Sequence, residues 1–426
     1  MPHLLIVSDK DIFREETASA LTIRSFVENW DRASIYQIVC NDFNSYPSGI
    51  VDSHTFHFAH DSILVGSRIV KDNRHKTEAV FVPSAIKNEG EDNSILKQFR
   101  ALAVGLYQEL PYNFYNTEFR VWLKTIKVDA IYTEFTDART LKLVRKLASV
   151  FNVPVLPHFM DDWPSVYLPQ FPLLRILNRS FNNRLKRFLR TCDTCFCISE
   201  SMCQEYCKRY NLDIFVPLMH SVEVYNDYKP LAYNNVIKLL YSGSLYLDRY
   251  KTLLLLCEGL NQIKQENFEF NIFCSQKNWD AVSILFNKYS FVNYRGFINQ
   301  DELLNEIERT DLLVFAESFD AKMLSFTKFS LSTKVPEYLS SGRPILALGN
   351  NEQGSIEYLN NHKAAYTITN EKDIVNKVID VIKGNDYETI MTNAKDLFIN
   401  NHVKSKQQDR FREYIDKAIN RHGASN

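Results

Sequence analysis

Lys334 and Glu337 are the two residues of this sequence whose types and spacing best suit the binding of a nucleotide. They fall in a short helix predicted within residues 331–346. A helix N-terminus offers unpaired N–H groups and partial positive charge to an anion, and Lys334 adds a full charge there. Glu337, one turn further on, can accept hydrogen bonds from sugar hydroxyls. The pair therefore predicts phosphates at Lys334 and a ribose at Glu337; the alternative is an ordinary surface helix.

The residues around this pair predict a short helix followed by a buried strand. Ser332 or Thr333 is expected to cap the helix, because a hydroxyl there can accept a free N–H of the first turn. Pro336 falls in that turn, where a missing N–H removes no hydrogen bond. Gly342 is expected to end the helix, and the apolar run at 345–348 predicts the strand.

The order of the other predicted elements indicates the fold class. A buried strand over residues 4–8, a helix that begins near Thr17 and a strand over 34–40 open a doubly wound α/β sheet. The alternation restarts at residue 237, after a polar, turn-rich linker over 225–235. A length of 426 residues suits two domains. We expect two Rossmann-like domains and a terminal helix, at residues 1–224, 236–400 and 401–426.

Three further stretches resemble one known family. They are LLYSGS, FVNYRGF and DLLVF, at residues 239–244, 291–297 and 311–315. With EYLSSGRPIL at 337–346, they are similar to the nucleotide domain of retaining, GT-B-fold glycosyltransferases of the family 4 type. The resemblance is strong over residues 239–359 and weak before residue 130. It implies a GT-B fold, in which two Rossmann-like domains face a central cleft and the last helix crosses back toward the first domain.

The resemblance assigns the motif to a sugar-nucleotide donor. In the family, the lysine and the glutamate bind the diphosphate and the ribose; these positions are Lys334 and Glu337, with Ser332 at the helix start. The donor is a co-substrate, and no cofactor is expected. No metal is expected either, because cations and the helix N-terminus would stabilise the negative charge that develops on the leaving diphosphate.

Other donor contacts are implied outside the motif. Gly243 follows the first strand of the second domain, in a tight turn that brings N–H groups toward a phosphate. A basic pair after this turn neutralises the diphosphate in the family, and Arg249 or Lys251 is the best match. Phe297 and Ile298 fall in the strip that contacts the base. Alternatively, Arg249 and Lys251 are solvated charges at a helix start.

One departure from the family pattern lies in the first domain. A glycine-rich loop normally follows the first strand and lets the backbone approach the substrates. Residues 9–16 contain no glycine, so Lys10, Arg14 or Thr17 is expected to take over this contact. The alternative is a solvated, charged loop.

A second departure concerns a carboxylate that normally faces the donor sugar. The family commonly has two glutamates separated by seven residues, and counting back from Glu337 places the first at Phe329. Glu317 lies too far upstream to count as the same residue. Either the backbone near Phe329 and Ser330 serves instead, or the donor sugar differs.

The stretch LPHFMDDW at residues 156–163 carries most of the chemistry of the first domain. It follows a predicted strand, and open α/β sheets place ligands at the carboxyl ends of their strands. His158 and Asp161 are predicted to contact the transferred sugar or the acceptor, with Trp163 as a stacking wall. The alternative makes Asp162 a helix cap, Trp163 a core residue and His158 a satisfied turn histidine.

Residues 173–190 predict a basic amphipathic helix. Its apolar residues follow helical spacing, and arginine and lysine occupy much of the remainder. Such a helix can lie on an anionic membrane, which suits a lipid-linked acceptor. Packing against its own domain is the alternative.

The overall composition excludes several classes of protein. A net charge of −1 argues against bulk binding of nucleic acid, and neither a signal sequence nor a membrane span is expected, so the protein should be cytoplasmic. Cys192 and Cys195 have a spacing that zinc can use. A buried strand around Cys195 and free thiols are the expected alternative.

Together these features predict a glycosyltransferase. The first domain would bind a sugar or lipid-linked acceptor and the second the sugar nucleotide, for transfer to a hydroxyl with retention of configuration. Surface polysaccharide or glycolipid assembly is the expected setting. A non-catalytic GT-B-like scaffold subunit and a sugar-nucleotide epimerase on the same fold are the competing hypotheses.

Overall fold

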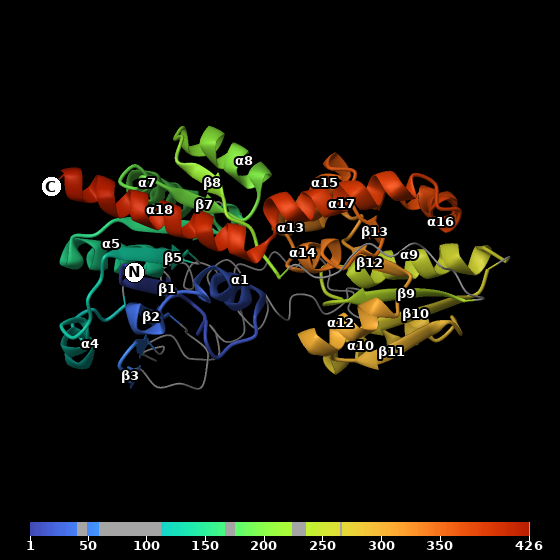
Figure 1. The fold of residues 1–426 in the computed structure, drawn as a ribbon, viewed down its shortest axis with the longest axis horizontal. Helices are drawn as coiled ribbons and strands as arrows, with labels where there is room; N and C mark the ends of the chain where they lie inside the picture. Colours follow the sequence, from blue (N-terminus) through green and yellow to red (C-terminus); the bar gives the residue numbers. More distant parts are fainter. Residues whose placement is uncertain are drawn as a thin grey trace. The chain divides into compact units, whose positions relative to one another are not determined.

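The computed structural model describes residues 1–40, 49–58, 112–135, 137–166, 175–223, 236–264 and 266–425, and all structural statements below concern these residues. The chain forms two compact units. The first contains the described residues up to His220 and, from the end of the chain, residues 405–425. The second runs from Ser221 to Lys404. Helix α18 (Lys404–Ser425), red in Figure 1, is therefore almost wholly part of the first unit.

The first unit is built on an eight-stranded sheet with the order β3-β4-β2-β1-β5-β6-β7-β8. All described pairs are parallel except β3 with β4. The chain adds strands first on one side of β1 and then, from β5 onward, on the other, so the topology reverses between β1 and β5. The strands are β1 (Leu4–Ser8), β2 (Ile35–Val39), β3 (Gly49–Asp52), β4 (Thr55–His57), β5 (Ala130–Glu134), β6 (Val155–Phe159), β7 (Cys195–Cys197) and β8 (Phe215–Pro217).

Apolar helix faces cover this sheet. Phe26 of α1 and Phe411 of α18 pack in one core cluster with Leu4 and Tyr132 of the strands. Helix α1 (Ala18–Val27) begins beside Thr17, as predicted, and the Thr17 side chain caps it by accepting the N–H of Ala20 at 3.4 Å. Besides α18, the α-helices described in this unit are α1 (Ala18–Val27), α4 (Thr117–Leu123), α5 (Ala138–Phe151), α6 (Trp163–Val166), α7 (Arg175–Leu189) and α8 (Glu200–Tyr210).

Helix α7 is the predicted basic amphipathic helix. Its apolar residues Phe181, Leu185 and Phe188 are buried, because the helix packs on its own unit. This part of the apolar face is therefore not available to a lipid surface, whereas Ile176, in the first turn, is 79% exposed. Membrane contact of this helix stays a prediction. None of the helices in the described part of the chain has both the length and the apolar composition to cross a bilayer.

The second unit contains a six-stranded parallel sheet with the order β11-β10-β9-β12-β13-β14. Here the topology reverses between β9 and β12. The strands are β9 (Ile237–Ser242), β10 (Phe268–Phe273), β11 (Val292–Gly296), β12 (Leu312–Ala316), β13 (Ile345–Leu348) and β14 (Tyr366–Ile368).

The helices of this unit follow the predicted alternation with one difference. The sequence pattern predicts a single helix over residues 279–288. In the structure α10 ends at Asp280 and α11 covers only Ser283–Phe286, because Val282 leaves helical geometry at φ −134° and is buried in the core. The helices are α9 (Arg249–Gln262), α10 (Gln276–Asp280), α11 (Ser283–Phe286), α12 (Gln300–Glu308), α13 (Leu324–Thr327), α14 (Lys334–Leu339), α15 (Gly354–Asn361), α16 (Ile374–Ile382) and α17 (Tyr387–Asn401).

Candidate functional site

An arginine–glutamate pair lies where the topology of the second sheet reverses. Glu317 directly follows β12, and Arg249 is the first residue of α9, which follows β9. The guanidinium donates to both oxygens of the carboxylate, from Nη2 to Oε1 at 2.8 Å and from Nε to Oε2 at 3.0 Å. The side chain of Glu317 is 5% exposed and that of Arg249 is 21% exposed. Ligands of open α/β sheets bind at such a reversal, outside the carboxyl ends of the strands.

Glu317 holds Arg249 in place without saturating it. A guanidinium has five N–H donors, and the carboxylate takes two of them. Burial lowers the pKa of Arg249, but its attraction to Glu317 and Tyr241 more than offsets this, so the pKa is raised and the charge is permanent. The remaining donors can bind an anion from a fixed position. The pair thus places a fixed cation with free donors at the sheet edge, and Arg249 lies where the sequence predicted a cation.

Lys334 and Glu337 form a second ion pair in this unit. Nζ of Lys334 lies 2.8 Å from Oε2 of Glu337, whose side chain is 8% exposed. The predicted helix is present as α14, and Gly342 follows it with φ +68°. Ser332 accepts the N–H of Lys334 through Oγ at 3.3 Å, whereas Thr333 makes no side-chain cap.

Tyr338 connects this second pair to the first strand of the unit. Its hydroxyl accepts the backbone N–H of Ser242, the last residue of β9, at 3.2 Å. Burial raises the pKa of Tyr338, so the phenol stays protonated. Since Tyr338 directly follows Glu337, this bond places α14 beside the carboxyl end of β9. Both ion pairs therefore belong to the same edge of the sheet.

Two of the predicted donor contacts differ in the structure. The N–H of Gly243 donates to the carbonyl of Phe273 at 3.0 Å, so it is not free for a phosphate, although φ of +156° explains the glycine. Lys251 is half exposed and pairs with Asp248 at 2.8 Å. Of the two basic candidates, Arg249 is therefore the one fixed at the edge of the sheet, by its pair with Glu317. Lys251 is a solvated charge at the start of a helix, which was the alternative to a donor contact.

Gln353 was missed by the sequence interpretation. It directly precedes α15 and its side chain is fully buried, yet neither the oxygen nor the nitrogen of its amide has a partner in the described part of the chain. A Cβ on Gly349 would lie 2.6 Å from this amide oxygen and 2.9 Å from the Cβ of Glu317. The amide is thus next to Glu317. Buried polar groups are normally hydrogen-bonded, so this amide can bind a polar ligand. No motif in the sequence marks a single glutamine of this kind.

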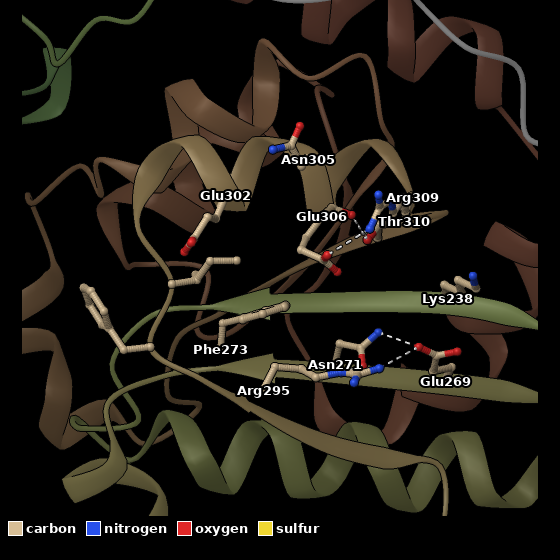
Figure 2. Close-up of a pocket in the computed structure, with 12 residues that line it drawn as sticks. Lys238, Glu269, Asn271, Phe273, Arg295, Glu302, Asn305, Glu306, Arg309 and Thr310 are labelled. Carbon is tan, nitrogen blue, oxygen red and sulfur yellow. Dashed lines mark hydrogen bonds and ion pairs between the residues drawn. The ribbon is translucent and has the colours of Figure 1, made fainter.

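A polar cavity of about 820 Å³ lies against one face of β9–β11, under α12 (Figure 2). Within it, Arg295 donates to Asn271 at 2.8 Å and lies 3.5 Å from Glu269. Phe297 and Ile298 line the end that follows β11, and the side chain of Phe297 is 81% exposed. An exposed aromatic ring is free to stack on a base, so the predicted contact at Phe297 stays a prediction.

His158 lies in the core of the first unit and not at its surface. Its side chain is fully buried among aromatic rings, and Nδ1 lies 2.6 Å from the hydroxyl of Tyr132. Burial lowers the pKa of His158 to about 3. This position corrects the prediction that His158 contacts a sugar. His158 is the second-last residue of β6, inside the sheet, and does not belong to the loop beyond it.

The two aspartates after β6 have different surroundings. Asp161 is exposed. Asp162 accepts from both terminal nitrogens of Arg209, at 2.7 and 3.0 Å, and from the hydroxyl of Tyr206 at 2.8 Å. Asp162 therefore ties the loop to α8, and the predicted sugar or acceptor contact of Asp161 stays a prediction. Trp163 packs on Phe159 and Phe181, as its alternative reading predicted.

The loop without glycine is held by a buried aspartate. Asp11 is 1% exposed and accepts from Gln37 at 2.9 Å and from the N–H of Phe13 at 3.1 Å. Lys10 lies 3.6 Å from Asp9. Arg14 is half exposed and lies 3.8 Å from Asp11 and from Asp52. A substrate contact by Lys10 or Arg14 stays a prediction.

The structure also addresses the zinc hypothesis. Cys195–Cys197 forms β7, and all of the cysteines are free thiols. Across the described ranges, no three histidine, cysteine or acidic side chains come close enough to hold a metal ion.

Comparison with solved structures identifies the fold. A glycosyltransferase from Rickettsia africae aligns over 98% of this chain and 99% of its own, with TM-score 0.56 and 13% identity. Sucrose-phosphate synthase from Thermosynechococcus elongatus aligns over 97% and 98%, with TM-score 0.60 and 11% identity. HepE from Anabaena, solved in complex with UDP, aligns over 97% and 99%, with TM-score 0.58 and 12% identity.

These alignments show that the chain has the GT-B fold, as the resemblance implied. No protein-family model matches the chain, and no curated protein sequence is significantly similar to it.

Proposed function

We propose that this protein is a glycosyltransferase that moves a sugar from a nucleoside-diphosphate donor to a hydroxyl group of an acceptor. The observation that carries the proposal is the pairing of Arg249 with Glu317 where the second sheet reverses, with Lys334 and Glu337 at the same sheet edge. The GT-B neighbours, among them glycosyltransferases and a UDP complex, support it.

The chemistry of these residues fits departure of a diphosphate. As the bond between the sugar and the phosphate breaks, negative charge builds up on the leaving group. The donors of Arg249 that Glu317 leaves free, and the ammonium of Lys334, would stabilise this charge from fixed positions. No step of this scheme requires a metal ion. Gln353 would supply a neutral donor and acceptor to the same ligand.

Binding would exchange one ion pair for another at Lys334. The ammonium donates to Glu337 in the structure, and a diphosphate is the stronger competitor for it because it carries more charge. Glu337 would then be released to accept ribose hydroxyls. This exchange would give both members of the Lys334–Glu337 pair a role in binding the nucleotide. An ordinary surface salt bridge would have no such role.

The remaining parts of the proposal rest on the resemblance. We infer transfer with retention of configuration, a sugar or lipid-linked acceptor bound by the first unit, and a role in surface polysaccharide or glycolipid assembly. Peripheral membrane contact through residues 173–190 would use the basic side chains of α7 and the exposed Ile176, since Phe181, Leu185 and Phe188 are buried.

A screen of sugar nucleotides for hydrolysis tests the proposal. We expect slow release of nucleoside diphosphate from one donor, and loss of this release in Lys334→Ala. Lys288→Ala is the matched control, because Lys288 is an exposed lysine of the same unit that pairs with Glu258. Hydrolysis of no donor, or equal hydrolysis by Lys334→Ala, would contradict the proposal.

A scaffold subunit is the second candidate. It is favoured by the two departures from the family pattern: residues 9–16 contain no glycine, and Phe329 occupies the position of the first glutamate. A scaffold predicts binding of neither a nucleoside diphosphate nor a sugar nucleotide.

A further inference from the structure

A buried carboxyl group lies where the topology of the first sheet reverses. Glu134 is the last residue of β5, and β5 pairs with β1 so that Thr133 lies opposite Val7. The chain continues beyond β1 into Asp9 and Lys10. On its other side, Glu134 lies opposite His158 of β6. The carboxyl ends of three neighbouring strands thus converge on Glu134.

Glu134 lacks the partner that its burial requires. The residue is 7% exposed, and Oε2 makes no hydrogen bond within the described part of the chain. The nearby His158 does not supply one, since its Nδ1 pairs with the hydroxyl of Tyr132 and its Nε2 makes no hydrogen bond within the described residues. A buried carboxyl oxygen without a partner is unfavourable, so this atom marks a place for a ligand.

The groups that face Glu134 give the site a net negative charge. Asp9 and Asp161 act on it from the ends of β1 and β6, and Lys10 is the opposing cation, paired with Asp9 at 3.6 Å. Burial raises the pKa of Glu134, the two aspartates raise it further, and Lys10 lowers it; the net shift is well above its ordinary value. Two further carboxylates beside the group would repel an anion, whereas a neutral hydroxyl can donate to Glu134 and accept from Lys10.

We propose that Glu134, Asp9, Lys10 and Asp161 form the acceptor site and that it takes the hydroxyls of an uncharged sugar in preference to a phosphorylated one. The inference rests on the proposed function and adds the acceptor's chemical class. It also assigns Asp161, predicted from the sequence, to the acceptor rather than to the donor sugar. A recognition role, and no proton transfer, is assigned to Glu134.

The test combines binding with kinetics on the full chain. Saturation-transfer NMR would measure binding of methyl glycosides of glucose, galactose, mannose and N-acetylglucosamine, each beside its 6-phosphate. Transfer to those that bind would be measured with the donor selected by hydrolysis. We expect a neutral glycoside to bind, and Glu134→Gln to raise its KM by about two- to tenfold, the value of a hydrogen bond between neutral groups, because the raised pKa of Glu134 favours its protonated form.

Controls separate this inference from the proposed function. Asp193→Asn replaces an exposed carboxylate of the same unit that precedes β7, and it should leave the acceptor KM unchanged. Donor hydrolysis should be unchanged in Glu134→Gln. Absence of binding by any neutral glycoside, preference for the phosphorylated partner, or an unchanged KM in Glu134→Gln would overturn the inference while donor hydrolysis persists. Absence of donor hydrolysis in the unsubstituted protein would instead overturn the proposed function, and this inference with it.

Discussion

Replacement of Arg249 by leucine should strongly destabilise the second unit. The substitution leaves Glu317, whose side chain is 5% exposed, without either of its two charge-assisted hydrogen bonds. Removing one member of a buried ion pair typically costs about 3–5 kcal/mol, because the remaining charge is left desolvated. We therefore expect the free energy of unfolding of this unit to fall by about that amount.

The structure also predicts an asymmetry between the two partners. Glu317→Leu leaves Arg249, which is 21% exposed and can turn part of its guanidinium to water, so we expect a smaller loss of about 1–2 kcal/mol. The double variant Arg249→Leu/Glu317→Leu should be more stable than Arg249→Leu alone, since no unpaired charge remains. Lys251→Leu is the control: it breaks an exposed pair with Asp248 and should cost at most about 1 kcal/mol.

Hydrogen exchange measured by mass spectrometry would report the stability of the second unit separately from that of the first. Peptides from β9 and β12 report the opening of the sheet that carries the pair. A loss below about 1 kcal/mol in Arg249→Leu, or a double variant less stable than both single ones, would refute the reasoning, because neither result is compatible with a buried, bidentate pair.

Three further predictions concern other residues. Because the pKa of Glu134 is raised above its ordinary value of 4.5, its contribution to stability is full below that value and is lost as pH rises through the raised pKa. Chemical unfolding should therefore show Glu134→Gln gaining stability relative to the unsubstituted protein as pH rises above 4.5. Gly349→Ala should cost about 2–4 kcal/mol in thermal unfolding, since φ is +155° and the new Cβ meets Gln353 and Glu317, whereas Gly384→Ala, in open space at φ +69°, should cost about 1 kcal/mol. Asp162→Asn should loosen the loop after β6, seen as faster hydrogen exchange there, because both of its oxygens bind Arg209.

The sequence was sufficient for most of the fold because the buried strands are continuous apolar runs. The run at 345–348 is strand β13 as predicted, and the strand–helix alternation of the second unit is present except at Val282. That break depends on burial of one side chain in the core, which a local pattern does not reveal. The apolar face of α7 likewise has the same pattern whether it meets lipid or its own sheet.

The candidate site was only partly predictable, because ion pairing depends on the tertiary fold. Lys334 and Glu337 were found together, since they share a helix turn. Arg249 and Glu317 are 68 residues apart in the chain, and only the parallel pairing of β9 with β12 brings them together. His158 shows the reverse case: two aspartates follow it within four residues of the chain, but its neighbours in space are aromatic.

Titration of nucleoside diphosphates into the full chain by calorimetry tests the central claim most directly. The claim is that the edge of the second sheet, with Lys334 and the Arg249–Glu317 pair, is an anion site for a nucleotide. We predict that one of UDP, GDP or ADP binds with one-to-one stoichiometry, that Lys334→Ala weakens binding by about ten- to hundredfold, and that Lys288→Ala does not. Binding of none of the three, or equally tight binding by Lys334→Ala, would contradict the claim.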